Sequence, residues 1–428
     1  VEIYHTYAKS LVERGLAYPC FCTEEELDKV RAKQEEDKVL TGYYGEYATC
    51  RNLSYEEIEA NIKAGKPYVL RLRSQGSPDK EITFVDAIKG EIKLPENIHD
   101  IVLLKKDGIP TYHFAHAIDD HLMRTTTVVR GGEWLASAPI HYELFHLLGF
   151  KMPAYAHTAH LMKFDEETGG KRKLSKRKDP ELSLDYYRKD GYHPYTMKVY
   201  LLTLLNSNFE EWHEKFPDKD INEFPFSVEK MNQSGALFDK DKLHNICKNE
   251  LSKLSEEQLY DFLYDWAKEN EPENVEKWFG DREKMLQILR LYMGVGAKRR
   301  RKDLMYAKQI FELISYFFDG ESSEEMDEFK LDDDMVSKIL KSYLAKYDHN
   351  DDNSVWFNKL KEIADEHGFA SDMKAYKANP ENFKGNVSDI AEAVRIAVTG
   401  RANTPDLWTI VHIMGEEQMT ERIKKHIK

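Results

Sequence analysis

The chain has 428 residues, of which 41% are hydrophobic and 12% aromatic, and 62 Lys and Arg against 76 Asp and Glu give it a net charge of −14. This length and apolar content predict two to four globular domains and exclude an intrinsically disordered chain. No long apolar run predicts a membrane-spanning helix, and four cysteines are too few for a disulfide framework, so we expect a cytoplasmic protein. The negative charge argues only weakly against a nucleic-acid partner, because such partners contact local basic patches.

The start of the chain predicts mixed helix and strand. Residues 1–17 have the apolar spacing of a helix with Gly15 near its end, which suggests that Val1 is an interior residue of a longer protein. Thr23 precedes three glutamates, an arrangement that predicts a helix N-cap. Residues 68–73, Y-V-L-R-L-R, alternate apolar and basic side chains as a strand does.

The next segments predict a hairpin and then a nucleotide-binding unit. Residues 101–104 and 109–114 are apolar runs separated by a turn that ends in Asp-Gly, which favours a β-hairpin. The β-branched strand 125–129 is followed by a tight Arg-Gly-Gly turn, a short helical turn and a helix that starts near Pro139 and ends at Gly149. Strand, glycine turn and helix form the local order of a nucleotide-binding α/β sheet.

From about Leu182 onward the sequence predicts helices almost throughout, for example 256–267 and 305–318. The acidic stretch 321–334 predicts a solvated connector between helical parts. The expected fold class is therefore an α/β region followed by an all-α region.

A basic loop, K-L-S-K-R, occupies residues 173–177. Three cations in five residues suit a polyphosphate whose charge grows during a reaction, because Lys supplies a mobile point charge and Arg a planar fork. Taken alone, so short a motif more often marks a solvated loop. The segments that accompany it change this interpretation.

Several segments occur in a fixed order around this loop. P-T-Y-H-F-A-H-A-I-D-D-H-L-M at 110–123 and V-V-R-G-G-E-W-L at 128–135, followed by K-L-S-K-R, resemble the signature of the glutamyl-tRNA synthetase family, with Leu174 in the place of a methionine. Residues 235–243 resemble the segment that opens the family's anticodon region, and residues 397–416 its C-terminal helices. The resemblance covers essentially the whole chain.

The resemblance implies a glutamate site formed by Tyr112, His116 and Arg130. Arg130 is implied to bind the side-chain carboxylate of glutamate. A bidentate guanidinium binds a carboxylate better than it binds an amide. The alternatives are a structural salt bridge for Arg130 and ordinary strand packing for Tyr112. His116 stands where the family often has asparagine, so its role toward the substrate is left open.

The resemblance also implies an ATP site and a catalytic loop. The residues implied to border ATP are Gly132, Glu133, Trp134 and Lys176. The residues of the implied catalytic loop are Lys173, Ser175, Lys176 and Arg177, of which Lys176 is implied to stabilise the departing pyrophosphate. The alternative for Glu133 and Trp134 is an acid matched to a helix dipole beside a buried indole.

Three cysteines form a candidate zinc site. Cys20 and Cys22 are followed by Cys50, and some members of the family hold zinc in this insertion with C-x-C and a later C-x-H or a tyrosine. The family's histidine is replaced by asparagine here, so Tyr47 or Glu46 would have to provide the fourth ligand of a tetrahedral site. Zinc is thus a candidate cofactor alongside the implied ATP and Mg²⁺.

Other groups of candidate metal ligands have simpler interpretations. The adjacent side chains of Asp119, Asp120 and His121 do not easily converge on one ion, so capping and loop hydrogen bonds are favoured. His157 and His160 could share a helix face but lack an evident third ligand, and we expect them to be structural.

The densest basic cluster, K-R-R-R-K at 298–302, falls in the helical half. A solvated helix end is a frequent fate of such a run. The resemblance instead favours contacts with tRNA phosphates, made by Lys298, Arg299, Arg300 and Arg301.

The resemblance implies a partial class I Rossmann catalytic core with an inserted mixed α/β connective domain, then helical anticodon-binding domains. The expected parts are the end of the first Rossmann half with the insertion (1–105), the second Rossmann half (106–172), the K-L-S-K-R loop with a stem-contact region (173–250), and two anticodon-binding subdomains (251–360 and 361–428). The P-x-G-x-x-H-x-G-H type signature of class I synthetases is not found, so we expect the chain to be incomplete for catalysis.

The implied function is ATP-dependent attachment of L-glutamate to tRNA(Glu) by a monomer, with no membrane partner and with tRNA(Gln) left open as a second substrate. The alternative is a non-catalytic tRNA-binding fragment or paralogue, which the missing signature favours. A glutaminyl-tRNA synthetase usually carries β-barrels where this chain predicts helices. A short tRNA-modifying paralogue would end near K-L-S-K-R.

Overall fold

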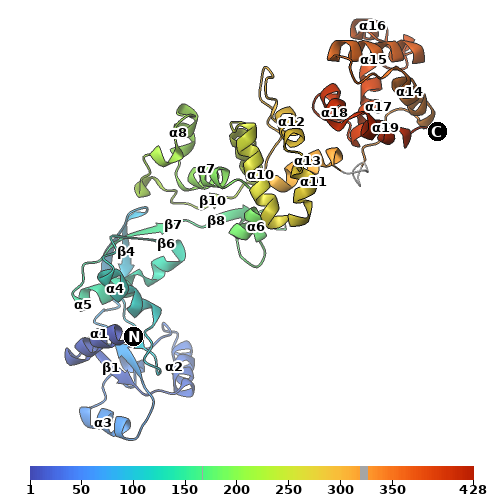
Figure 1. Cartoon of the computed structure of the whole chain (residues 1–428). Helices are drawn as coiled ribbons and strands as arrows, with labels where there is room; N and C mark the ends of the chain where they lie inside the picture. Colours follow the sequence, from blue (N-terminus) through green and yellow to red (C-terminus); the bar gives the residue numbers. More distant parts are fainter. Residues whose placement is uncertain (166, 319–325) are drawn as a thin grey trace. The chain divides into compact units, whose positions relative to one another are not determined.

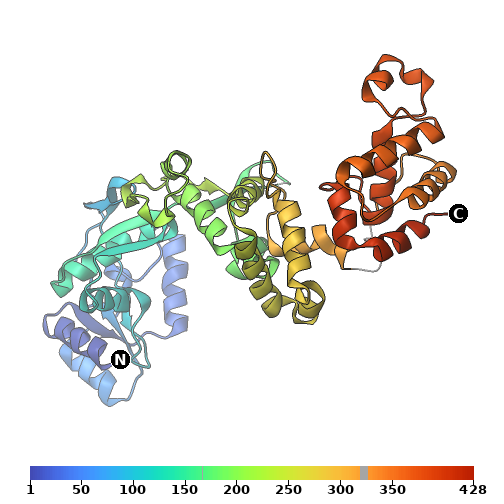
Figure 2. The same cartoon turned by 45° about the horizontal axis from the view of Figure 1, so that its top comes forward.

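The computed structural model describes residues 1–165, 167–318 and 326–428. These residues form two compact units, and each is described by itself. Unit 1 comprises Val1–Leu174 and Leu202–Phe238, and unit 2 comprises Ser175–Leu201 and Asp239–Lys428. Within the described ranges, the strands lie in unit 1, in the blue-to-green part of the chain (Figures 1 and 2). No helix of the described ranges has the length and apolar character needed to cross a bilayer.

Unit 1 combines three small sheets with helices. Its strands are β1 (Ala17–Cys20), β2 (Val69–Leu72), β3 (Glu81–Asp86), β4 (Gly90–Pro95), β5 (Val102–Leu104), β6 (Thr127–Gly131), β7 (Ala154–Thr158), β8 (Leu161–Phe164), β9 (Lys171–Lys173) and β10 (Ala236–Leu237). Its helices are α1 (Glu2–Glu13), α2 (Glu24–Glu36), α3 (Tyr55–Lys63), α4 (Tyr112–Leu122), α5 (Ala138–Leu148) and α8 (Phe209–Lys215). The sheets have the strand orders β1-β2-β5, β10-β8-β9 and β4-β3-β7-β6.

The four-stranded sheet positions the candidate site. β7 runs parallel to both β3 and β6, while β4 pairs antiparallel with β3. The register places Arg130 of β6 beside His157 of β7. Phe84 and Tyr155 from the sheet pack against Ala138 at the start of α5. Parallel strands present their carboxyl ends at one edge, which is where ligands of open α/β sheets bind.

Several predicted element ends are confirmed. Thr23 accepts from the backbone N–H of Glu26, whose side chain returns to the Thr23 N–H, so α2 begins with a capping box. α5 has a proline in its first turn and ends at Gly149, which has a φ of +71°. The helix predicted for residues 1–17 is shorter, because α1 stops at Glu13 and Gly15 turns the chain with a φ of +72° before β1.

The predicted hairpin is wrong in its second half. The turn forms, and Leu104 and Pro110 make an isolated antiparallel bridge. Thr111 then adopts the N-cap conformation of a helix, and Tyr112 begins α4. Phe114, Ala117 and Ile118 lie on one face of that helix and are buried, so helical burial outweighs the short strand-like run.

Unit 2 consists of helices and their connections in the described ranges. Its helices are α6 (Leu184–Asp190), α9 (Lys240–Leu251), α10 (Glu256–Asn270), α11 (Val275–Phe279), α12 (Arg282–Met293), α13 (Ala307–Ile314), α14 (Asp333–Lys346), α15 (Asn353–His367), α16 (Met373–Ala378), α17 (Val387–Thr399), α18 (Leu407–Met414) and α19 (Glu416–Lys424), and α7 (Pro194–Leu205) belongs partly to each unit. Buried apolar side chains from Leu251 to Ile423 form one core. Of the predicted acidic connector 321–334, residues 321–325 lie outside the described residues.

Candidate functional site

Arg130 lies at the centre of the candidate substrate site, next to the last residue of β6. Its guanidinium is half buried, and burial lowers the pKa of the group. Nε donates to His157 Nε2 over 2.9 Å, and Nη1 lies 3.1 Å from His141 Nδ1. No carboxylate of the described residues forms an ion pair with Arg130. An anionic ligand would therefore meet a cation that has no acidic partner of its own.

Aromatic rings surround this cation. The guanidinium carbon of Arg130 lies 4.7 Å from the centre of the Tyr155 ring and 5.8 Å from that of Trp134. The Trp134 ring is in turn 4.7 Å from Tyr112, which is 52% exposed and forms the open side of the group. The structure thus brings together Tyr112 and Arg130, which the resemblance assigns to the glutamate site, and Trp134, which it assigns to the ATP site.

His116 also belongs to this group. Its ring lies parallel to Tyr112 at 5.8 Å, and its Nε2 is 2.8 Å from the Tyr155 hydroxyl. Nδ1 lies 3.1 Å from an Asp120 carboxylate oxygen. Burial lowers the pKa of His116, and although Asp120 opposes this effect, Arg130 adds to it. His116 is therefore a neutral side chain within the site.

Three further histidines near Arg130 are neutral for the same reason. Burial is the main cause that lowers the pKa values of His113, His141 and His157, and the positive charge of Arg130 acts in the same direction on each. For His141 the pKa falls to about 2. At neutral pH the imidazoles that surround Arg130 therefore add no positive charge.

The residues predicted to border ATP follow Arg130 directly. Gly131 is extended and belongs to β6, so the tight turn predicted here is wrong, and the chain turns instead in the 3-10 helix η2 (Gly132–Ser137). A side chain at Gly131 would collide with the Glu133 carboxylate. The Nε2 atom of His160 lies 3.5 Å from that carboxylate and 3.5 Å from Lys173 Nζ. Glu133 and the first lysine of the basic loop thus share one imidazole neighbour.

Residues 175–177 of the basic loop lie in unit 2 and belong to a closed turn. The Ser175 N–H donates to the Asp179 carboxylate over 2.8 Å, and the Asp179 N–H donates back to the Ser175 carbonyl over 2.9 Å. Lys176 and Arg177 are exposed, and no acid of the described residues pairs with them. Their charges are available to an anion such as a polyphosphate.

The basic cluster 298–302 forms a loop after α12, and not the helix end considered as its alternative. Arg299 and Arg301 line a cavity of about 740 Å³, together with Arg290 and with His412 of α18. Arg301 pairs with Asp303, whereas Lys298, Arg299 and Arg300 are exposed. The structure therefore brings two of the four predicted tRNA contacts into one cavity and leaves Lys298 and Arg300 outside its lining.

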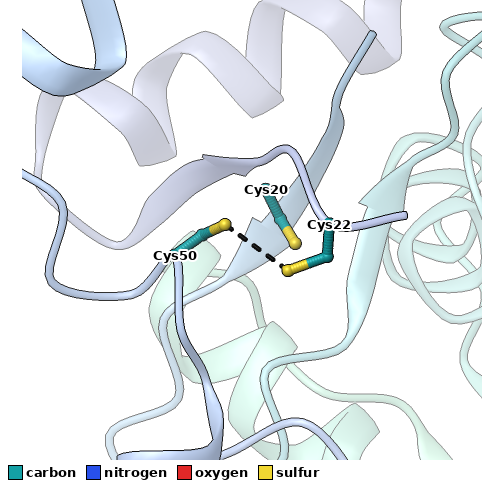
Figure 3. A group of neighbouring side chains, drawn as sticks. All are labelled: Cys20, Cys22 and Cys50. Carbon is teal, nitrogen blue, oxygen red and sulfur yellow. Dashed lines mark hydrogen bonds between the residues drawn. The ribbon is translucent and has the colours of Figure 1, made fainter. Parts of the chain in front are cut away.

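The three cysteines of the candidate metal site converge. Figure 3 shows the side chains of Cys20, Cys22 and Cys50 turned toward one another. Their sulfur atoms all lie within 4.8 Å of each other, and the thiols are free. Hydrogen bonds from the neighbouring thiols lower the pKa of Cys20. Three sulfurs at this spacing fit one tetrahedral ion with Zn–S bonds of about 2.3 Å.

The hydroxyls of Tyr43 and Thr49 contact these sulfurs, Thr49 Oγ1 at 3.2 Å from Cys22 Sγ, and the predicted Tyr47 and Glu46 are not part of the group. The Tyr43 hydroxyl lies 3.4 Å from Cys20 Sγ and 3.3 Å from Cys22 Sγ, and it accepts from the Cys50 N–H. The Tyr47 hydroxyl instead donates to Asp37 over 3.0 Å. Tyr43 stands seven residues before Cys50, outside the spacing used for the prediction.

The chain is similar to known proteins along nearly its whole length. Residues 1–245 match the family model of class I tRNA synthetases (E and Q), catalytic domain, and residues 258–427 match that of an anticodon binding domain. A glutamate–tRNA ligase of Acetivibrio thermocellus is 53% identical over 426 residues, which are 99% of this chain and 77% of the relative. The chain belongs to the glutamate–tRNA ligase family. A Clostridium perfringens member is 46% identical over 431 residues, covering 100% of this chain and 77% of the relative.

Solved structures agree with this family. The crystal structure of a glutamate tRNA ligase from Elizabethkingia meningosepticum in complex with its amino acid matches with a TM-score of 0.75 and 25% identity, over 99% of this chain and 82% of that one. Glutamate-tRNA synthetase of Elizabethkingia anophelis matches with a TM-score of 0.74 and 26% identity, over 100% and 82%. The predicted order of a class I catalytic domain and a helical anticodon-binding domain is confirmed.

The family signature did not identify all the residues of the site. His141 of α5 and His157 of β7 contact Arg130, and Asp86 of β3 contacts His157. His157, which was expected to be structural, lies on strand β7, so it does not share a helix face with His160. Its only sequence signal is its position in an apolar strand, where a buried polar side chain requires a partner.

Proposed function

We propose that this chain is a glutamate–tRNA ligase that uses ATP to attach L-glutamate to the 3′ end of tRNA(Glu), acting as a monomer. The observation that carries the proposal is Arg130, a half-buried guanidinium without an acidic partner among the described residues, at the carboxyl end of β6. A carboxylate accepts from two of its N–H groups, whereas the amide of glutamine turns an N–H₂ toward them. Tyr112 and His116 line the same site.

In the proposed reaction the α-carboxylate of glutamate attacks the α-phosphorus of ATP. The bond from that phosphorus to the oxygen bridging to the β-phosphate breaks, and pyrophosphate leaves. Lys176 and Arg177 neutralise the charge that grows on the leaving group, and Mg²⁺, when bound to the phosphates, shares this role. The terminal ribose hydroxyl of tRNA then attacks the glutamyl carbonyl, and AMP leaves with the hydroxyl proton. No side chain serves as a covalent nucleophile.

Charging assays test this function. This chain, alone and preceded by a segment with the P-x-G-x-x-H-x-G-H type signature, would be incubated with labelled glutamate, ATP and either tRNA(Glu) or tRNA(Gln). We expect the protein with the signature to charge tRNA(Glu), and charging of tRNA(Gln) would show a wider specificity. If neither tRNA is charged although both bind in a gel-shift assay, the alternative of a non-catalytic tRNA-binding protein takes the place of the ligase.

We further propose that Arg299 contributes to tRNA binding through a phosphate contact. Replacing it with alanine is expected to weaken tRNA binding and to reduce the slope of log Kd against log salt by about one, because one fewer counterion is released. The measurement is a filter-binding titration at several salt concentrations. Lys374→Ala, on the exposed surface of α16, removes the same charge elsewhere in unit 2 and serves as the control. Equal slopes for the two variants would remove Arg299 from the interface.

Zinc is proposed at Cys20, Cys22 and Cys50, with Tyr43 as the fourth ligand. The fit depends on three converging sulfurs and on a buried hydroxyl in contact with two of them. When bound, the ion would hold the loop that carries Cys50 to the loop after β1, and no reaction step passes through it.

Metal analysis of the purified protein checks this proposal. We expect one zinc per chain, loss of the metal in Cys22→Ser, and a lower melting temperature after chelation, because metal binding contributes to folding. Tyr43→Phe is expected to weaken zinc binding without abolishing it. Cys247→Ala removes a buried thiol of α9 that is not part of the cluster, so it should retain full metal content. A zinc-free wild-type protein would contradict the site.

A further inference from the structure

The hydrogen bonds of Arg130 determine where its histidine neighbours carry their protons. A guanidinium has five N–H donors and no acceptor. Its Nε is 2.9 Å from His157 Nε2 and its Nη1 is 3.1 Å from His141 Nδ1. Both ring nitrogens must therefore accept, which places the single proton of each neutral imidazole on the opposite nitrogen.

On one side of Arg130 this proton points to a carboxylate. His157 Nδ1 donates to Asp86 over 2.6 Å, and the His157 backbone N–H donates to the same oxygen over 3.0 Å. The other Asp86 oxygen accepts from the N–H groups of Ile88 and Lys89. Burial opposes ionisation of Asp86, but these hydrogen bonds outweigh it and lower its pKa. Asp86 is therefore an ionised acceptor that holds His157 in one tautomer.

On the other side of Arg130, hydrogen bonds continue through two imidazoles, those of His141 and His113. His141 carries its proton on Nε2 and donates it to His113 Nδ1 over 2.9 Å. His141 is fully buried, so its ring cannot move away without leaving a void or an unpaired nitrogen. Arg130 is thus fixed at Nε and at Nη1 by acceptors from two different elements.

These acceptors are neutral, and that affects the charge offered to a ligand. An aspartate in direct contact with Arg130 would cancel much of its charge. Here the carboxylate of Asp86 is separated from the guanidinium by a whole imidazole ring. The guanidinium keeps its positive charge, and its further neighbours are uncharged: Nη2 lies 3.5 Å from the Trp134 carbonyl, and the Tyr112 side chain is a hydrogen-bonding partner.

We propose that His157, fixed by Asp86, and His141 are positioning residues that hold Arg130 as an uncompensated cation with free N–H groups for the side-chain carboxylate of glutamate. Their neutral contacts set the preference for glutamate over glutamine. This inference rests on the proposed function, in which Arg130 binds that carboxylate.

Two matched substitutions at His157 separate its two hydrogen bonds. The amide nitrogen of asparagine takes the place of Nδ1, so His157→Asn keeps the bond to Asp86 and loses the acceptor for Arg130. The amide oxygen of glutamine takes the place of Nε2, so His157→Gln keeps the acceptor for Arg130. Asp86→Asn can donate to Nδ1, which would move the ring proton to Nε2, where it meets an arginine donor.

The measurement is steady-state charging of tRNA(Glu), with separate KM values for glutamate and ATP and the ratio of kcat/KM between glutamate and glutamine. His157→Asn and Asp86→Asn are expected to raise the glutamate KM about tenfold or more and to lower the glutamate preference, with the ATP KM unchanged. His157→Gln should recover most of the loss. Thermal unfolding of each variant verifies that it is folded.

Equal rises of both KM values, or equal losses in the asparagine and glutamine variants, would overturn the inference, because a structural defect predicts these results. Arg130→Gln distinguishes the proposed role of Arg130 from the positioning role of His157. If it leaves the glutamate KM unchanged, the proposed role of Arg130 fails. If it raises the glutamate KM whereas His157→Asn does not, only the positioning role fails.

Discussion

Replacing Arg130 with glutamine is expected to lower kcat/KM for glutamate by about a hundredfold or more. Removing one partner of a buried, hydrogen-bonded charge pair costs about 2–5 kcal/mol, and about 1.4 kcal/mol corresponds to a factor of ten. The carboxylate of the substrate would enter a half-buried site lined by neutral imidazoles and aromatic rings, with no other cation in direct contact with these rings among the described residues. Charging kinetics with varied glutamate measure the effect.

Two further variants show whether this loss of kcat/KM is specific to the Arg130 side chain. Arg130→Lys keeps the charge but not the planar fork, so an intermediate loss is expected. Arg31→Gln removes an exposed arginine of α2 that pairs with nearby Asp28, and it should leave the kinetics unchanged. If Arg130→Gln and Arg31→Gln behave alike, Arg130 does not bind the substrate.

The second large effect is expected for Lys176→Ala. Loss of one preorganised group that stabilises transition-state charge typically lowers kcat about 10²–10³-fold. Lys176 is exposed, and the hydrogen bonds between Ser175 and Asp179 order the turn that carries it. We therefore expect kcat to fall while the Kd for tRNA remains unchanged. Pyrophosphate exchange in the presence of tRNA measures the activation step directly.

Lys178 provides the matched control for this prediction. It lies in the same turn, two residues later, and is also exposed. Lys178→Ala removes the same charge from the same loop, so a simple loss of basic character would affect both variants alike. Equal kcat values for the two variants would show that Lys176 has no special role in pyrophosphate departure.

Local signals predicted element ends well. Thr23 with Glu26 forms the expected capping box, and Gly149 ends α5 in the left-handed conformation, because these features depend on neighbouring residues alone. The error at 109–114 arose because so short a run, six residues, suits a strand or a helix equally. Phe114, Ala117 and Ile118 have helical spacing, which a longer window would have detected.

The candidate site was predicted in part. Tyr112, His116, Arg130 and Trp134 belong to two ordered motifs, so the resemblance located them, and the structure places them together. Asp86 and His157 approach Arg130 through the pairing of β3, β7 and β6, and strand register is a long-range property that no local pattern encodes. Tyr43 was missed because loop geometry, and not sequence spacing, brings its hydroxyl to the cysteines.

The chain of hydrogen bonds through Arg130 also limits how the site can change during evolution. Every bond in it points outward from the guanidinium, toward Asp86 on one side and toward His113 on the other. The Asp86 arm ends in a carboxylate that can only accept, so a substitution at His157 that keeps both bonds must supply an acceptor and a donor at fixed positions. The other arm ends in an imidazole that can accept or donate. Natural variants of the site should accordingly accumulate at His113 and His141, while Asp86 and His157 change only as a pair.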